Sequence, residues 1–281
     1  MSPTCQAATV SFRPCSELKV AGGLDKSLKS LLIFALAFKF SPFLKNLTVP
    51  NSTEPGYLIE IFGEDPEGSP DIGPVYRVTT QKDLIDVPDS LHKLIPTTYF
   101  VRAQTSYTAE SSSLFRFGLS VAGKAKLKID GKDSIDLWTS HPVKTDNTPV
   151  FNRLTMERFA EVNVKGGQTL ALQVIMTNES IGTAVGILPT LTARLGGYEV
   201  IDEDKALLEA AELAKKVDVP IVIAGLSSDY EYEGCDRKSL KLPQRVDALV
   251  QTVLEANPNT VSHTPRITSP VYLSLPCQSL I

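Results

Sequence analysis

A short apolar run from Val219 to Ala224, closed by Gly225, constrains the fold of this chain more than any other feature. Its length and its β-branched residues are typical of a strand that is buried on both faces of a sheet. Apolar residues recur at helical spacing before it, over 206–217, and after it, over 246–254. Asp202 is a candidate N-cap for the first of these helices. This alternation of helix and strand predicts an α/β region with a parallel sheet.

Charged residues follow the apolar run directly. They are Asp229, Glu231, Glu233, Asp236 and Arg237. In open α/β sheets, ligands bind beyond the carboxyl ends of the strands. Several carboxylates beside a guanidinium are suited to acid/base chemistry or to recognition of a polyhydroxylated ligand. On composition alone, a solvated acidic loop explains the cluster equally well.

Between residues 57 and 176 the pattern changes to short strands separated by polar turns. Phe115, Phe117 and Leu119 alternate with polar or small residues, as in a half-buried strand. Asp130-Gly131 between two such strands is a strong hairpin signal. Strands are expected at 57–62, 75–80, 98–103, 115–121, 126–130, 132–138, 159–164 and 170–176. The fold class is therefore α+β and multidomain: an antiparallel β-sandwich joined to a partial α/β sandwich.

The order of residues in the charged segment is more specific than its composition. Glu233-Gly234 is followed by Asp236-Arg237 and then by a leucine-containing stretch, 240–243, that enters the next helix. This order resembles the second domain of glycoside hydrolase family 3, the β-glucosidases. The resemblance implies a retaining hydrolase that acts on β-linked glucosides. It also implies that Glu233 is the general acid/base, with Glu231, Asp236 and Arg237 near the substrate.

Residues 115–138 resemble a second known domain. A strand that begins at Phe115 is followed by a Leu-x-Ile-Asp-Gly hairpin, 127–131, and by a strand that ends in Leu137-Trp138. This order is similar to protective-antigen-type domains, which some family 3 β-glucosidases insert into their second domain, where they help to select the glycan. The resemblance implies that Trp138 stacks on a sugar ring. The alternative, and the commoner place for the only tryptophan of a sandwich, is the core.

A retaining glycosidase needs a second carboxyl group about 5–5.5 Å from the first. In family 3, this nucleophilic Asp belongs to a Ser-Asp-Trp motif in a (β/α)₈ barrel ahead of the second domain. The motif does not occur in this sequence, and the residues before position 56 are fewer than the about 250 of such a barrel. We therefore expect a truncated or diverged member with impaired activity alone. Two alternatives stay open: a non-catalytic glycan-binding or accessory protein, and a truncated product with no settled activity.

The sequence divides into four expected parts. They are a divergent N-terminal segment (1–55), the protective-antigen-type sandwich (56–185), a partial α/β domain (186–261) and a divergent tail (262–281). The apolar run 31–38 is shorter than the about 20 residues of a membrane span, so we interpret it as a buried core segment. The strand at Val219 should either be covered by residues 1–50 or have exposed edges, which would favour self-association.

Composition limits the partners of the chain. A net charge of −4 provides no basic surface for nucleic acid. The four scattered cysteines and three separated histidines predict neither a disulfide scaffold nor a zinc site, and we expect no metal and no cofactor. A β-glucoside or other glycan is the expected ligand. Localisation stays open, because sequons at Asn46, Asn51 and Asn178 fit a secretory route whereas no cleavable signal is visible.

Overall fold

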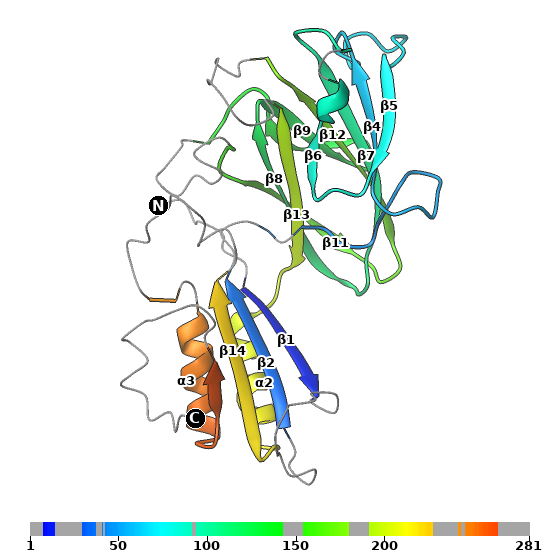
Figure 1. Ribbon diagram of the computed structural model, residues 1–281. Coiled ribbons are helices and arrows are strands. Elements are labelled where there is room, and N and C mark those ends of the chain that lie inside the picture. The colour runs from blue at the N-terminus through cyan, green and yellow to red at the C-terminus, as the bar shows by residue number, and fades with distance from the viewer. Residues whose placement is uncertain are drawn as a thin grey trace. The chain divides into compact units, whose positions relative to one another are not determined.

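The chain forms two compact units, of which one is inserted into the other. The computed structural model describes residues 8–14, 30–37, 41, 43–91, 94–142, 154–179, 191–226, 241–242 and 245–263. One unit comprises Ser41–Val200, and the other combines Met1–Phe40 with Ile201–Ile281. The chain leaves the second unit after strand β2 (Ser30–Ala37) and returns to it before helix α2 (Glu203–Ala214) (Figure 1).

The inserted unit is an antiparallel β-sandwich (Figure 1). Its larger sheet has the order β10-β9-β12-β7-β4-β5, and β3 also pairs with β7. The strands of this sheet are β3 (Leu47–Thr48), β4 (Tyr57–Phe62), β5 (Tyr76–Thr80), β7 (Phe100–Thr108), β9 (Lys124–Ile129), β10 (Lys132–Leu137) and β12 (Thr169–Thr177). The smaller sheet, in the order β11-β8-β13-β6, contains β6 (Leu84–Asp86), β8 (Ser113–Ala122), β11 (Arg158–Val164) and β13 (Thr192–Glu199). A short 3₁₀ helix, η1 (Asp89–Leu91), follows β6.

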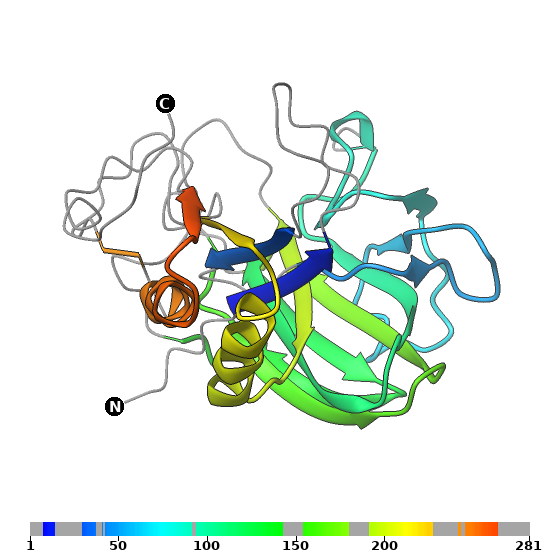
Figure 2. The ribbon, with the colours of Figure 1, turned by 90° about the horizontal axis from the view of Figure 1, so that it is seen from below.

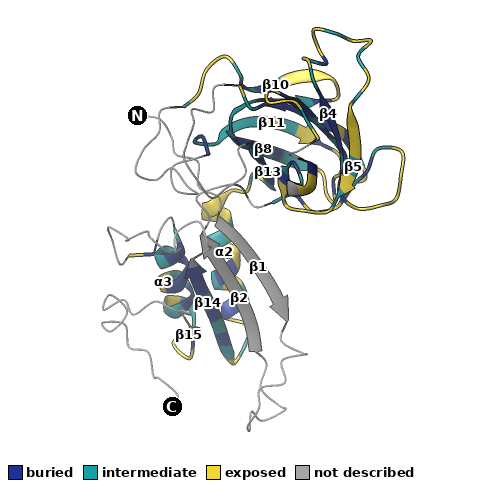
Figure 3. Ribbon diagram, turned by 45° about the horizontal axis from the view of Figure 1, so that its top comes forward, coloured by how far each residue is buried: buried dark blue, intermediate teal, exposed yellow. Residues whose placement is uncertain are grey.

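The core of the sandwich lies between the two sheets, and residues of both sheets are coloured as buried in Figure 3. The rings of Tyr107, Phe115 and Phe117 pack against one another there, with centroids 4.8, 4.9 and 5.7 Å apart. Leu119 and Val121 continue the inward row of β8 and have no exposed surface. On the other face of β8, Gly118 and Ser120 are also buried, because residues 155–157 lie against them.

β13 is a strand that the sequence analysis missed. Its residues were assigned to the partial α/β domain (186–261), but they pair with β8 on one side and with β6 on the other. The pair Gly196-Gly197 is not a turn here. A Cβ at Gly197 would lie 2.5 Å from the ring of Phe115 and 2.8 Å from Leu44, so close packing requires glycine. The expected boundary at residue 185 is therefore too early.

The N-terminal boundary of the sandwich is also corrected. We expected it at residue 56, but β3 and the residues from Ser41 onward belong to the sandwich. Residues 1–40 do not form a separate segment, because the apolar run expected to be buried is strand β2 of the other unit. Long-range pairing, which short sequence patterns do not reveal, sets both boundaries.

The second unit is a four-stranded sheet with two helices on one face (Figures 1 and 2). Its order is β1 (Ala8–Pro14), β2, β14 (Val219–Leu226) and β15 (Val261–His263). β14 is parallel to both β2 and β15, whereas β1 is antiparallel to β2. α2 and α3 (Val246–Ala256) share one apolar cluster with β14, formed by Ala210, Ala214, Val222, Ala224, Leu242, Val246, Leu249, Val250 and Val253. No described helix has the length and apolar character needed to cross a membrane.

β14 is fully covered on one face only. Val222 and Ala224 have no exposed surface, because they lie under the helices. Val219, Ile221 and Ile223 point to the opposite face and are half-buried. The prediction of a strand buried on both faces is therefore wrong in part for the described residues.

Candidate functional site

The candidate site lies at the carboxyl edge of the α/β sheet. Because β2, β14 and β15 are parallel, they all end at one edge, at Ala37, Leu226 and His263. Residues 227–240 continue the chain from that edge. Leu242, which returns to the apolar cluster of the helices, is 4% exposed. Both ends of the segment are thus fixed to the fold of the α/β unit.

The predicted loop residues are carried by this segment. Glu231, Glu233, Asp236 and Arg237 all fall within 227–240, outside the described residues. Their roles stay predictions. The structure describes the strand before this segment, β14, and the helix after it, α3.

The N-terminal ends of both helices lie at the same edge, because α2 leads into β14 and α3 follows from it. Asp202 caps α2 as predicted: its carboxylate accepts from the backbone N–H groups of Asp204 and Lys205, each at 3.1 Å. Arg245, the residue before α3, donates to the Asp204 carboxylate at 2.6 Å. This hydrogen bond raises the pKa of Arg245. An ion pair therefore joins the two helix starts beside the point where the chain leaves β14.

Trp138 lies on the outer face of the larger sheet, not in the sandwich core. It follows Leu137, which is fully buried in the core, and successive residues of a strand point to opposite faces. The half-buried indole stacks on Phe100 with ring centroids 6.2 Å apart and an interplanar angle of 22°. The Lys126 amine lies 5.3 Å from the indole centroid. The core alternative for Trp138 is thus wrong, whereas its contact with a sugar stays a prediction.

The charges around Trp138 neutralise one another. The carboxylate of Asp136 accepts from the backbone N–H of Trp138 at 2.7 Å and from Thr139, whose hydroxyl lowers the pKa of Asp136. Glu67 pairs with Lys128 and with Lys126, the latter at 3.5 Å. Burial by itself would raise the pKa of Glu67, but the two lysines lower it overall. The surface beside the indole therefore suits a neutral ligand better than an ion.

The described residues contain no group of three or more His, Cys, Asp or Glu side chains placed to hold a metal ion.

A β-sandwich inserted into an α/β unit, whose parallel edge leads into a carboxylate-rich segment, defines the class of protein. The sequence model described as "Glycosyl hydrolase family 3 C-terminal domain" matches residues 44–272. The chain belongs to glycosyl hydrolase family 3, and the matched residues correspond to the C-terminal domain of that family.

Named relatives agree with this assignment. The chain is 30% identical over 217 residues to a β-glucosidase of Kluyveromyces marxianus. The aligned region covers 75% of this chain and 25% of that protein. It is 31% identical over 228 residues to a probable β-glucosidase J of Neosartorya fischeri. That alignment covers 77% of this chain and 26% of the relative. A probable β-glucosidase I of Aspergillus clavatus is 29% identical over 225 residues. That alignment covers 78% of this chain and 26% of the relative. The chain thus spans about a quarter of the length of these relatives.

The fold is also similar to a solved structure. The crystal structure of the Kluyveromyces marxianus β-glucosidase superimposes with a TM-score of 0.65 at 27% identity, covering 74% of this chain and 25% of that one. A second crystal structure of that enzyme, in complex with glucose, gives a TM-score of 0.62 at 25% identity. The predicted fold class is therefore confirmed: an antiparallel β-sandwich joined to a partial α/β sandwich.

Proposed function

We propose that this chain supplies the acid/base part of a retaining β-glucosidase site. In this proposal, Glu233 protonates the leaving oxygen of a β-linked glucoside, while Glu231, Asp236 and Arg237 hold the sugar. The nucleophilic carboxylate would come from a barrel domain outside the 281 residues of this sequence, because no Ser-Asp-Trp motif occurs within them. The substrate class is a β-glucoside, in keeping with the names of the relatives.

The observation that carries the proposal is the combination of family membership with the course of the chain at β14. The segment that contains Glu233 starts at the carboxyl edge of a parallel sheet, which is where α/β folds bind ligands. Its far end is tied to the core by Leu242, and Arg245 pairs with the start of α2. The proposal requires this segment to hold Glu233 where it can meet the leaving oxygen of the substrate.

A second candidate function is glycan binding without turnover. The observation that favours it is the place of Trp138 on the outer face of the larger sheet, where its half-buried ring stacks on Phe100. Aromatic rings at a surface combine an apolar face with polar surroundings, which suits the faces of sugar rings. In the proposed enzyme, the same residue would help to select the glycan.

The proposal is tested by a chimera in which this chain replaces the matching part of the Kluyveromyces marxianus β-glucosidase. Glu233→Gln should lower kcat/KM for methyl β-glucoside by about 10²–10⁴-fold, because its poor leaving group needs a proton. The loss should be far smaller for 2,4-dinitrophenyl β-glucoside, whose leaving group departs without protonation.

Glu231→Gln is the matched control in the same segment. It should raise KM without making the rate depend on the leaving group. An equal loss for both glucosides in Glu233→Gln would contradict the acid/base role and indicate a structural or binding role instead.

A further inference from the structure

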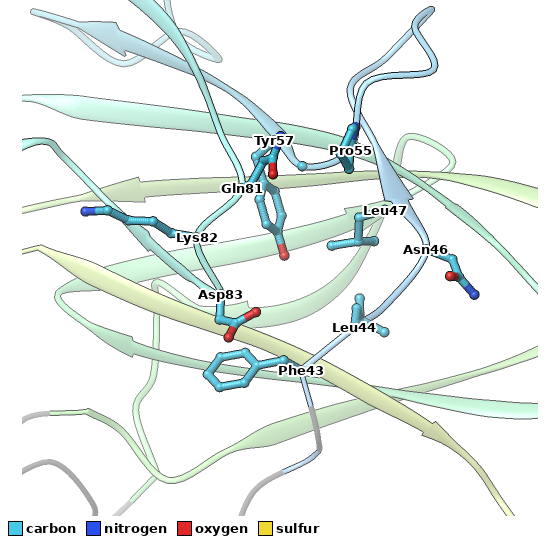
Figure 4. A pocket seen from close by; sticks show the side chains of 10 residues that line it. Phe43, Leu44, Asn46, Leu47, Pro55, Tyr57, Gln81, Lys82 and Asp83 are labelled. Atoms are coloured by element: carbon cyan, nitrogen blue, oxygen red, sulfur yellow. The ribbon is translucent and has the colours of Figure 1, made fainter. Parts of the chain in front are cut away.

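A half-open cavity of about 200 Å³ lies in the sandwich unit (Figure 4). One part of its wall is apolar and consists of Phe43, Leu44, Leu47 and Pro55. The opposite part comes from the start of β4 and from the turn between β5 and β6, residues 81–83. The cavity is thus bounded by segments that are distant in sequence and lie together in the fold.

The backbone around the cavity is held rigidly. Gly56 has a φ of +115°, and a Cβ at this position would lie 2.1 Å from the carbonyl oxygen of Thr80. Only glycine allows this close approach of β4 to the turn. The buried hydroxyl of Thr105 lies 2.9 Å from the carbonyl oxygen of Gly56 and 3.1 Å from that of Thr48. The cavity is therefore largely formed before any ligand arrives.

Two polar groups face the cavity without a partner in the described part of the chain. Tyr57 is 4% exposed, and its hydroxyl points into the space beside Asp83 (Figure 4). Burial, and after it the charge of Asp83, raises the pKa of Tyr57, so the hydroxyl keeps its proton at physiological pH. Neither this hydroxyl nor the Asp83 carboxylate hydrogen-bonds to another described residue. The Asp83 side chain is exposed and the Tyr57 hydroxyl opens to the cavity, so both groups are available to hydrogen-bond to a ligand.

The remaining charged and amide groups nearby are engaged elsewhere. The Lys82 amine lies 3.1 and 3.2 Å from the two oxygens of Asp86, and the amide of Asn46 donates to Glu110. Both side chains point away from the cavity (Figure 4). The guanidinium of Arg194 packs over the ring of Phe43 at 4.2 Å from its centroid. An anion in the cavity would be repelled by the Asp83 carboxylate, and Lys82 is already paired with Asp86. A Ca²⁺ ion would lack the six to eight oxygen ligands that it requires.

We propose that this cavity binds one sugar ring of a neutral glycan. Hydroxyl groups of the sugar would donate to the Asp83 carboxylate and accept from the Tyr57 hydroxyl, with the exposed amide of Gln81 able to do both. The C–H face of the ring would pack against Phe43 and Leu44. Choosing a glucoside as the ligand rests on the proposed function, but the site itself involves none of the residues assigned to catalysis.

The test is a titration of the full chain with methyl β-D-glucopyranoside, followed by amide chemical shifts in ¹H–¹⁵N NMR spectra. Saturable shifts are expected at Tyr57, Gln81 and Asp83, with a dissociation constant on the order of millimolar, as befits one sugar ring. Asp83→Asn should raise that constant by about tenfold or more, because it removes a charged hydrogen-bond acceptor. Asp71→Asn, an exposed carboxylate of the same sandwich, is the matched control and should leave it unchanged.

Further variants separate this site from the proposed catalytic one. Tyr57→Phe keeps the buried ring but removes the hydroxyl, and it should also weaken binding. Glu233→Gln should leave the shifts at Gln81 and Asp83 unchanged. The proposal is overturned if no saturable shifts occur around the cavity, if Asp83→Asn binds as tightly as the original chain, or if inorganic phosphate occupies the cavity and the glucoside does not.

Discussion

The two units of this protein bury their strands in different ways. In the sandwich, each sheet covers the inner face of the other, and the rings of Tyr107, Phe115 and Phe117 fill the centre. In the α/β unit, α2 and α3 cover one face of β14, while Ile221 and Ile223 on the other face are only half-buried. Among the described residues, the sandwich strands are thus buried between two sheets, whereas β14 is fully buried on one face only. Segments with few buried contacts open more easily, and binding residues often lie on them.

The largest effect is expected from the centre of the sandwich. Phe117 has no exposed surface, so Phe117→Ala should lower the free energy of unfolding by about 3–5 kcal/mol through lost burial and a cavity. Chemical denaturation measures the change, and hydrogen exchange should show it in β8 and β7. Leu208→Ala on α2 is the control, because that leucine is 68% exposed. A loss below about 1 kcal/mol in Phe117→Ala would contradict the burial of this ring between the two sheets.

A buried carboxylate gives the next effect. The side chain of Glu60 is 3% exposed and pairs with Arg77 at 2.5 Å and with Arg102 at 2.7 Å. Glu60→Gln leaves both arginines without their counter-charge and should cost about 3 kcal/mol by the same denaturation measurement. Glu161→Gln is the matched control: its side chain is 42% exposed and pairs with Arg116, so the loss should stay below about 1 kcal/mol. Equal losses would show that the buried position of Glu60 contributes nothing.

In the α/β unit, the comparable test is Asn257, which links the ends of its two helices. Its amide donates to the carbonyl oxygens of Ala214 at 3.0 Å and Val217 at 2.8 Å. Asn257→Ala should cost about 1–2 kcal/mol and should speed hydrogen exchange in α2 and α3 but not in β8. Asn259→Ala removes a single contact of 3.4 Å and serves as the control. Faster exchange in the sandwich would break the distinction between the units.

Acid should affect the sandwich modestly through Glu67. Lys128 and Lys126 lower the pKa of this carboxyl below its ordinary value of 4.5. A lowered pKa in the folded state contributes stability above the ordinary value, and that stability is lost as the pH falls through the folded-state pKa. Glu67→Gln should therefore lower the free energy of unfolding by less than about 1 kcal/mol at pH 7. At a pH well below 4 it should leave the free energy of unfolding unchanged. A loss of unfolding free energy in Glu67→Gln that is the same at every pH would argue against the ion pairs with Lys126 and Lys128.

The smallest effect is expected at the proposed catalytic residue. The 281-residue chain by itself should hydrolyse aryl β-glucosides negligibly, because no nucleophile has been identified in it. Glu233→Gln should change neither this rate nor the melting temperature. Robust turnover by the purified chain that disappears in Glu233→Gln would refute the expectation and indicate a nucleophile within these residues.

Sequence reasoning succeeded where the signal was local. The Asp130-Gly131 turn joins β9 to β10 as predicted, with positive φ at both residues, and Asp202 caps α2. It failed at β13, because Gly196-Gly197 carries no strand signal and is needed only where Phe115 and Leu44 approach the backbone. It gave no strand for residues 30–37, since the partner β14 lies far along the chain. The residues of the proposed catalytic site came from the family resemblance and not from the fold.

By itself, the sequence determined most strands of the sandwich, the two helices and the family resemblance. Periodicity of two or of about three and a half residues decides strand or helix, because it reflects which side chains one element can bury. The tertiary structure alone decided which strands became neighbours, that Trp138 faces outward, and that Tyr57 and Asp83 meet at one cavity. The physical reason is that sheet pairing joins segments through backbone hydrogen bonds that look alike for every residue. Their choice of partner depends on how the whole chain buries its apolar faces.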